Sequence, residues 1–135
     1  MPSIMLIDHG TSEADTDTVF PLEVNSFDVL RGSLGKLITE EPRIIDLVSP
    51  SGMRLQLGIG GRYACGQLLR PDRLPPYLCA TSKQRLGNHH VEFMLGGTPT
   101  EVPPERCIST EDAYRIAEYF FIHDGPDPST NWIEV

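Results

Sequence analysis

The sequence predicts a single α+β domain over residues 1–135, with a mainly antiparallel sheet of five to seven strands and two packed α-helices. Three observations support this fold class. Short segments that alternate apolar and polar residues follow one another between turns, as antiparallel strands do. Two other segments carry apolar residues at helical spacing. Twelve prolines and twelve glycines are spread along the 135 residues, so the elements must be short and no linker divides the chain.

The N-terminal part is expected to contain a strand, a loop and a helix. Ser3–Asp8 has the composition of a strand, and the polar, acidic segment Gly10–Thr18 is expected to be a loop. A helix is predicted over Ser26–Glu41, because Ser26 can cap it and apolar residues recur at helical spacing. Pro42 disfavours helical backbone at the residue before it, so the helix is expected to end there.

A hairpin and two further strands are expected next. Arg43–Ser49 and Met53–Ile59 flank Pro50-Ser51-Gly52, which is a turn tripeptide. After two glycines, Arg62–Leu69 reads as another strand. Leu74–Ala80 is expected to be a short or edge strand, because its prolines cannot donate to a ladder.

The last third is expected to contain two strands, a helix and a closing strand. His89–Leu95 places Val91, Phe93 and Leu95 on one face, and Thr100–Val102 follows a glycine turn. The helix Ser109–His123 has the strongest signals, with Ser109 as its cap, acids in the first turn and an apolar face. Gly125 and Pro126 are expected to end it. Asn131–Val135 then closes the sheet and can bury Trp132.

The formal net charge of −8 is concentrated at the two ends of the chain. Residues 1–28 carry six acids and no base, whereas residues 100–135 carry eight acids and two bases. This balance repels nucleic acid and favours basic partners, although net charge also keeps a small protein soluble. The chain has no apolar run long enough for a membrane span and no signal-peptide pattern. We therefore expect a cytoplasmic protein that contacts neither membrane nor nucleic acid.

The cysteines and histidines are the candidates for nucleophilic catalysis or metal binding. Cys65, Cys79 and Cys107 are expected to be reduced and mostly buried. Cys107 lies two residues before the helix cap, a position that can lower a thiol pKa. His89 and His90 are expected to point to opposite faces of one strand, so they cannot jointly bind one metal. No metal or cofactor is expected. We interpret Gly58–Gly61 as a tight turn or bulge rather than a phosphate-binding loop, because no lysine follows these residues.

A surface for another protein is predicted on the outer face of Ser109–His123. Helical spacing places Arg115, Glu118, Tyr119 and Ile122 on that face. A tyrosine beside an aliphatic side chain is typical of the centre of an interface. Trp132 is read instead as a core residue of the sheet.

The last third also carries a series of residues in a recognisable order. They are Glu101-Val102-Pro103-Pro104, Ile108-Ser109, Ala113, Ala117, Tyr119-Phe120-Phe121, Gly125-Pro126 and Asn131-Trp132-Ile133-Glu134. This order resembles the C-terminal signature of the Imm1 immunity proteins, in which a proline loop leads into a helix with an alanine-rich inner face and a tryptophan stretch ends the domain. The resemblance covers residues 24–135. It departs at Asp127-Pro128, where the family usually has a basic or polar residue, and this makes the expected surface more acidic.

The resemblance implies a bacterial protein that binds and neutralises a toxin domain, often a deaminase or nuclease that acts on nucleic acid. Such a toxin has a basic groove that an acidic, compact partner can occupy. From the charge distribution we expect the contacts to include Glu118, Asp124, Asp127 and Glu23, with Tyr119 as an apolar anchor. The alternative is a small cytoplasmic ligand-binding domain or enzyme that uses Cys107 with His89 or His90.

Overall fold

The computed structural model describes residues 3–11 and 21–135, which form nine strands and two α-helices. The strands are β1 (Ile4–Asp8), β2 (Leu22–Val24), β3 (Arg43–Val48), β4 (Arg54–Ile59), β5 (Cys65–Leu69), β6 (Leu78–Thr81), β7 (Val91–Leu95), β8 (Thr98–Val102) and β9 (Asn131–Glu134). The helices are α2 (Phe27–Ile38), α3 (Thr110–His123) and the short 3-10 helix η1 (Pro104–Arg106). The predicted α+β class is confirmed, and the sheet has more strands than the five to seven expected.

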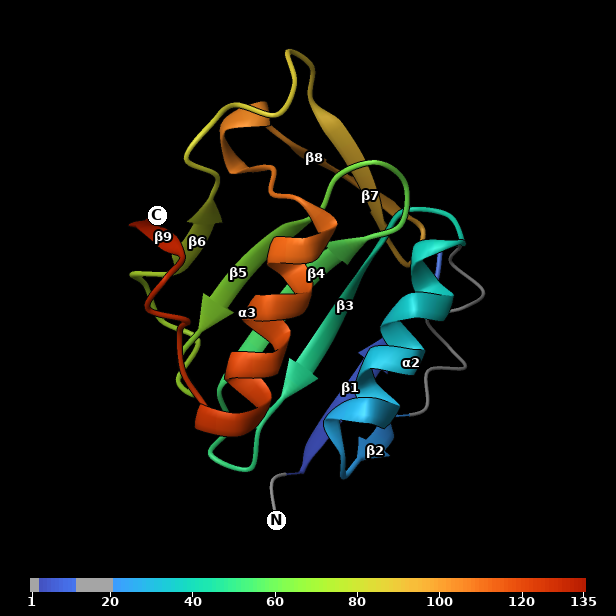
Figure 1. Cartoon of the computed structure of the whole chain (residues 1–135), viewed down its shortest axis with the longest axis vertical. Helices are drawn as coiled ribbons and strands as arrows, with labels where there is room; N and C mark the ends of the chain where they lie inside the picture. The colour runs from blue at the N-terminus through green and yellow to red at the C-terminus, as the bar shows by residue number, and fades with distance from the viewer. Residues whose placement is uncertain (1–2, 12–20) are drawn as a thin grey trace.

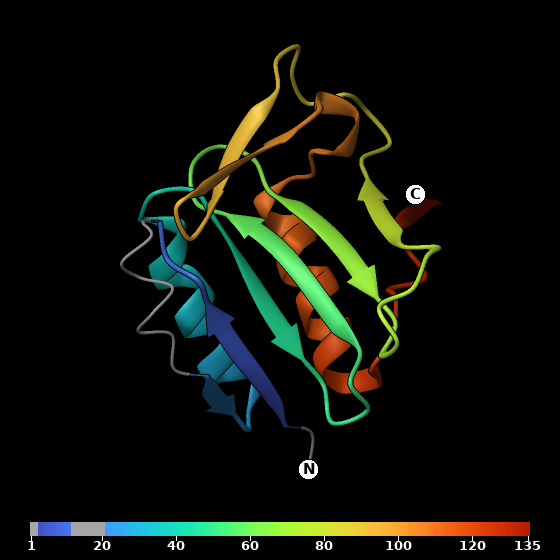
Figure 2. The ribbon, with the colours of Figure 1, turned by 180° about the vertical axis from the view of Figure 1, so that it is seen from behind.

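The strands run in the order β2-β1-β3-β4-β5-β6-β9, and each neighbouring pair is antiparallel. The β7–β8 hairpin joins this path at β3 through a parallel pairing of Arg43 with Met94. Both helices cover one face of the sheet, as Figure 1 shows. The view from behind in Figure 2 shows the other face, which neither α-helix covers and which the β7–β8 hairpin crosses at one end.

The core lies between the sheet and the two helices. On β4, Leu55, Leu57 and Ile59 alternate with polar or small residues and are at most 3 % exposed, as the period of two predicts. The predicted apolar face of α3 is buried against β4 and β5. Neither α2 nor α3 is both long and apolar enough to cross a membrane, and no other described segment forms such a helix.

Both predicted N-terminal helix caps are confirmed, whereas the C-terminal ends of the helices differ slightly from the prediction. The Ser26 hydroxyl accepts from the Val29 N–H, and the Ser109 hydroxyl accepts from the Asp112 N–H at 3.0 Å. The helix α2 ends at Ile38, three residues before the predicted Glu41. At the end of α3, the left-handed residue is Asp124, with φ of 54°, rather than the following glycine.

Several strand boundaries differ from the prediction. The strand β7 begins at Val91, so the two histidines before it belong to a bend and not to a strand. The strand β6 begins at Leu78, after the prolines that cannot pair in a ladder. The edge strand β2 was not predicted. Most of the segment Gly10–Thr18, expected to be a loop, lies outside the described residues.

Gly58 allows the β7–β8 hairpin to pack on the helix-free face. A Cβ at Gly58 would lie 2.5 Å from the Cys65 Sγ and 2.9 Å from the Phe93 ring. Phe93 is fully buried, so this close approach anchors the hairpin over β4. Two residues on, Gly60 has φ of 96° and fits against the backbone of Glu40 and Pro42, so the predicted turn begins at Gly60, while Gly58 and Ile59 belong to β4.

Candidate functional site

The outer face of α3 carries a shallow hollow with an apolar centre. Its volume is about 280 Å³, and it is lined by Arg115, Glu118, Tyr119, Ile122, His123 and Asp127. Ile122 is 50 % exposed. The Tyr119 ring is half-buried and stacks on the His123 ring with 4.3 Å between centroids. This site, which we call the α3 hollow, places Glu118, Tyr119 and Ile122 together as the helical spacing predicted.

Asp127 is a structural residue, which corrects its prediction as an exposed contact. It is only 4 % exposed, and its carboxylate accepts hydrogen bonds from the Arg115 Nε at 2.8 Å, from the N–H and hydroxyl of Ser129, and from the Thr130 hydroxyl. Its carbonyl accepts from the Trp132 Nε1 at 2.9 Å. Burial raises the pKa of Asp127, but these hydrogen bonds outweigh burial and hold the pKa below its usual value. The carboxylate is therefore ionised and already used within the chain.

The other two predicted acids lie in different places. Asp124 caps the end of α3 next to the hollow, and it is half-buried. Its Oδ1 is buried and has no hydrogen-bond partner among the described residues. Glu23 is exposed on the edge strand β2, where it accepts from the Ser3 hydroxyl at 3.3 Å. Because β1 and β3 separate β2 from the strands under α3, the fold does not bring Glu23 to the α3 hollow.

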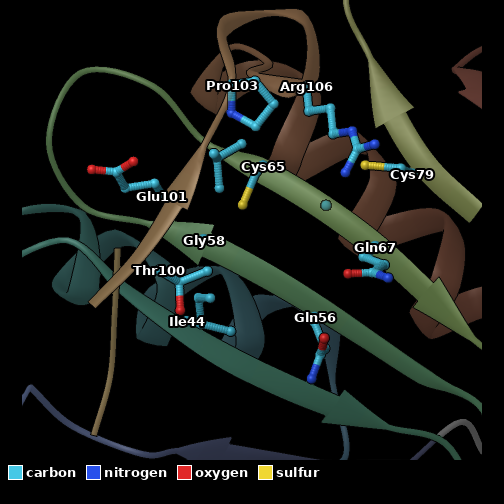
Figure 3. Close-up of a pocket in the computed structure, with 12 residues that line it drawn as sticks. Ile44, Gln56, Gly58, Cys65, Gln67, Cys79, Thr100, Glu101, Pro103 and Arg106 are labelled. Carbon is cyan, nitrogen blue, oxygen red and sulfur yellow. The ribbon is translucent and has the colours of Figure 1, made fainter. Parts of the chain in front are cut away.

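A second concave site, which was not predicted, lies on the face of the sheet that the α-helices leave open. It is a pocket of about 150 Å³ between β3, β4, β5, β6 and the segment from β8 to η1, and we call it the sheet pocket. Figure 3 shows that the Arg106 guanidinium reaches toward Cys79 above β5, whereas the Glu101 carboxylate points away from the pocket. Polar and apolar residues from these separate elements line it: Ile44, Gln56, Gly58, Cys65, Gly66, Gln67, Cys79, Thr100, Glu101, Val102, Pro103 and Arg106.

The thiols do not form an activated nucleophile. All three cysteines are free, and burial raises the pKa of Cys65 to about 12. Burial, reinforced by the negative charge of Glu105, raises the pKa of Cys107, so the lowered pKa expected from its position before α3 is wrong. His89 and His90 are both exposed before β7. Among residues 3–11 and 21–135, no three His, Cys, Asp or Glu side chains are grouped to hold a metal ion.

Cys65 is expected to resist alkylation in the folded protein. Because 12 lies three pH units above 9.0, its thiolate fraction at neutral pH is about a thousandfold lower than that of an ordinary thiol. Mass spectrometry after brief iodoacetamide treatment should find Cys65 unmodified in native protein and fully modified in urea. Equal modification rates in native protein and in urea would contradict the burial of the Cys65 thiol and its raised pKa.

No protein-family model matches the chain, and no curated protein sequence matches it.

Proposed function

We propose that this protein is an immunity protein of the Imm1 type, which binds and neutralises a cognate bacterial toxin domain by covering its active site. The observation that carries the proposal is the α3 hollow. There, half-exposed Ile122 and the Tyr119 ring form an apolar centre beside the exposed Glu118. An apolar centre with a polar rim is the usual anatomy of a protein interface.

The distribution of acids favours a basic partner. On the β7–β8 hairpin, Glu92 and Glu101 lie directly opposite each other, and both are exposed. Like charges at such a position destabilise a hairpin, and neither has an ion-pair partner among the described residues. Together with the net charge of −8, they produce a field that attracts a cationic surface. A toxin that acts on nucleic acid has such a surface.

Inhibition in this proposal is steric and stoichiometric. The negative field speeds the encounter with the basic groove of the toxin, and burial of the apolar centre slows release. The toxin's target is in the cytoplasm, so we place the protein there as well. The alternative, an enzyme that uses Cys107 with His89 or His90, lacks support from the site because burial disfavours the reactive thiolate.

The proposal predicts a toxin gene beside the gene for this protein, and co-expression of the two tests it. We expect cells that express the C-terminal toxin domain to stop growing, and cells that also express this protein to grow. An inactive toxin variant controls for expression burden. Growth arrest that persists in the presence of soluble, folded protein would remove the immunity function.

The contribution of the α3 hollow can be measured with a matched pair of variants. Ile122→Ala is expected to weaken toxin binding by about tenfold or more, because truncating a central apolar anchor costs about 2 kcal/mol. Val29→Ala on α2 is the control, since Val29 is 53 % exposed and Ile122 is 50 % exposed. The measurement is the dissociation constant from biolayer interferometry. Equal affinities for the two variants would place the interface elsewhere.

A further inference from the structure

We propose that the sheet pocket binds a carboxylate group, with the Arg106 guanidinium as its ionic partner. This inference does not depend on the proposed function. It rests on three observations: the Arg106 guanidinium has no ion-pair or hydrogen-bond partner among the described residues, the other polar side chains of the pocket are uncharged or point away, and the cavity is small.

Arg106 is half-buried and has no partner of its own in the part of the chain that the structure describes. None of the ion pairs or ring contacts there includes it, and its guanidinium donates no hydrogen bond. The other half-buried arginines, Arg43 and Arg54, are each paired with an aspartate. Leaving a partly desolvated cation unpaired is costly. No acid of the described residues pairs with Arg106, so we take its partner to be an anion bound in the sheet pocket.

The neighbouring groups complete a site for one negative charge. Gln56 and Gln67 line the same pocket, and their side-chain amides donate no hydrogen bond within the described structure. Burial raises the pKa of Cys79, so this thiol stays neutral beside Arg106 despite the opposing effect of the guanidinium. The Glu101 carboxylate points away and does not neutralise the site. One cation with two neutral amides matches a monovalent anion, and a guanidinium can hold both oxygens of a carboxylate.

The size of the cavity limits the ligand. A volume of about 150 Å³ equals that of about five water molecules at roughly 30 Å³ each. This accommodates a carboxylate on a short aliphatic chain, such as a small organic acid or an acidic side chain. Ile44 and Pro103 provide apolar contacts for the aliphatic part.

Titration of ¹⁵N-labelled protein with propionate, followed by NMR, tests the site directly. We expect saturable shifts of the Arg106 Nε–H and of the Gln67 side-chain amide. The neutral isostere propionamide should give none. In Arg106→Gln the dissociation constant should rise at least about tenfold, because the charged hydrogen bonds are lost. In Arg62→Gln it should not change, since Arg62 is exposed and lies over the Tyr63 ring. The spectrum of Arg106→Gln shows whether the variant is folded, and Arg106→Lys should retain weaker binding.

The same titration with a glutamate blocked at both backbone ends distinguishes the two sources of a carboxylate. If it produces the same shifts, the occupant is an acidic side chain of another chain. If only propionate does so, the occupant is a small acid. Shifts that are equal with propionamide, or unchanged in a folded Arg106→Gln, would overturn the proposal.

Discussion

Replacing Asp46 with alanine is expected to lower the free energy of unfolding by about 3–5 kcal/mol, a large part of the stability of a small domain. Asp46 lies on the helix-free face of β3, and its side chain is only 2 % exposed. Its Oδ2 accepts from the Arg54 guanidinium at 2.6 Å and contacts the His9 Nε2 at 2.9 Å. Removing the carboxylate leaves the Arg54 charge, which is 17 % exposed, without its partner in a poorly hydrated place.

A second aspartate provides the matched control. Asp72 forms an ion pair with Arg70 at 3.5 Å, but both side chains are about half exposed. Because solvent screens such pairs, Asp72→Ala is expected to cost less than about 1 kcal/mol. Urea unfolding of both variants measures the difference. If Asp46→Ala were no more destabilising than Asp72→Ala, the buried ion pair would not contribute as described.

The second large effect is expected at Asp127, which organises the turn between α3 and β9. Asp127→Asn should lower the free energy of unfolding by about 2–4 kcal/mol, because the carboxylate receives charged and neutral hydrogen bonds from several donors. The estimate lies below that for Asp46, since Arg115 is 46 % exposed and can be rehydrated. The Trp132 indole should lose order as well, because it donates to the Asp127 carbonyl.

The same variant should change how stability depends on pH. The folded pKa of Asp127 lies below its ordinary value of 3.8, so the unfolded chain takes up this proton first as the pH falls. The stability that the carboxylate provides is therefore fully present above about pH 4 and is lost as pH falls through the lowered pKa. Urea unfolding between about pH 7 and pH 3 should give a shallower acid decline in Asp127→Asn. Arg115→Gln should reproduce part of this change. An identical decline in wild type and Asp127→Asn would contradict the ionic role.

The elements predicted correctly are those with strong local signals. The helix α3 begins directly after Ser109, because the Ser109 hydroxyl accepts a hydrogen bond from an N–H of the first turn that has no partner within the helix. The β3–β4 hairpin follows from the alternation of apolar and polar residues on both sides of Pro50-Ser51-Gly52. The edge strand β2 has only three residues, too few for a periodic pattern. The docking of the β7–β8 hairpin depends on Phe93 meeting Gly58, a contact between distant parts of the sequence.

The same contrast between local signals and long-range contacts decides which parts of the candidate sites could be predicted. The grouping of Glu118, Tyr119 and Ile122 could be predicted, because residues three and four positions apart share one face of a helix. The burial of Asp127 was missed because Arg115 reaches it across the turn that follows the helix. The sheet pocket could not be predicted, because Arg106 comes from a short 3-10 helix and its neighbours from five different strands.

The immunity function is tested by isothermal titration of the purified protein into the purified domain of the toxin that the proposal expects to be encoded beside it. We expect a one-to-one complex with a dissociation constant below about 1 μM, and the toxin's activity should be lost at the equivalence point. Absence of binding at about 100 μM, with both proteins folded, would contradict the immunity function.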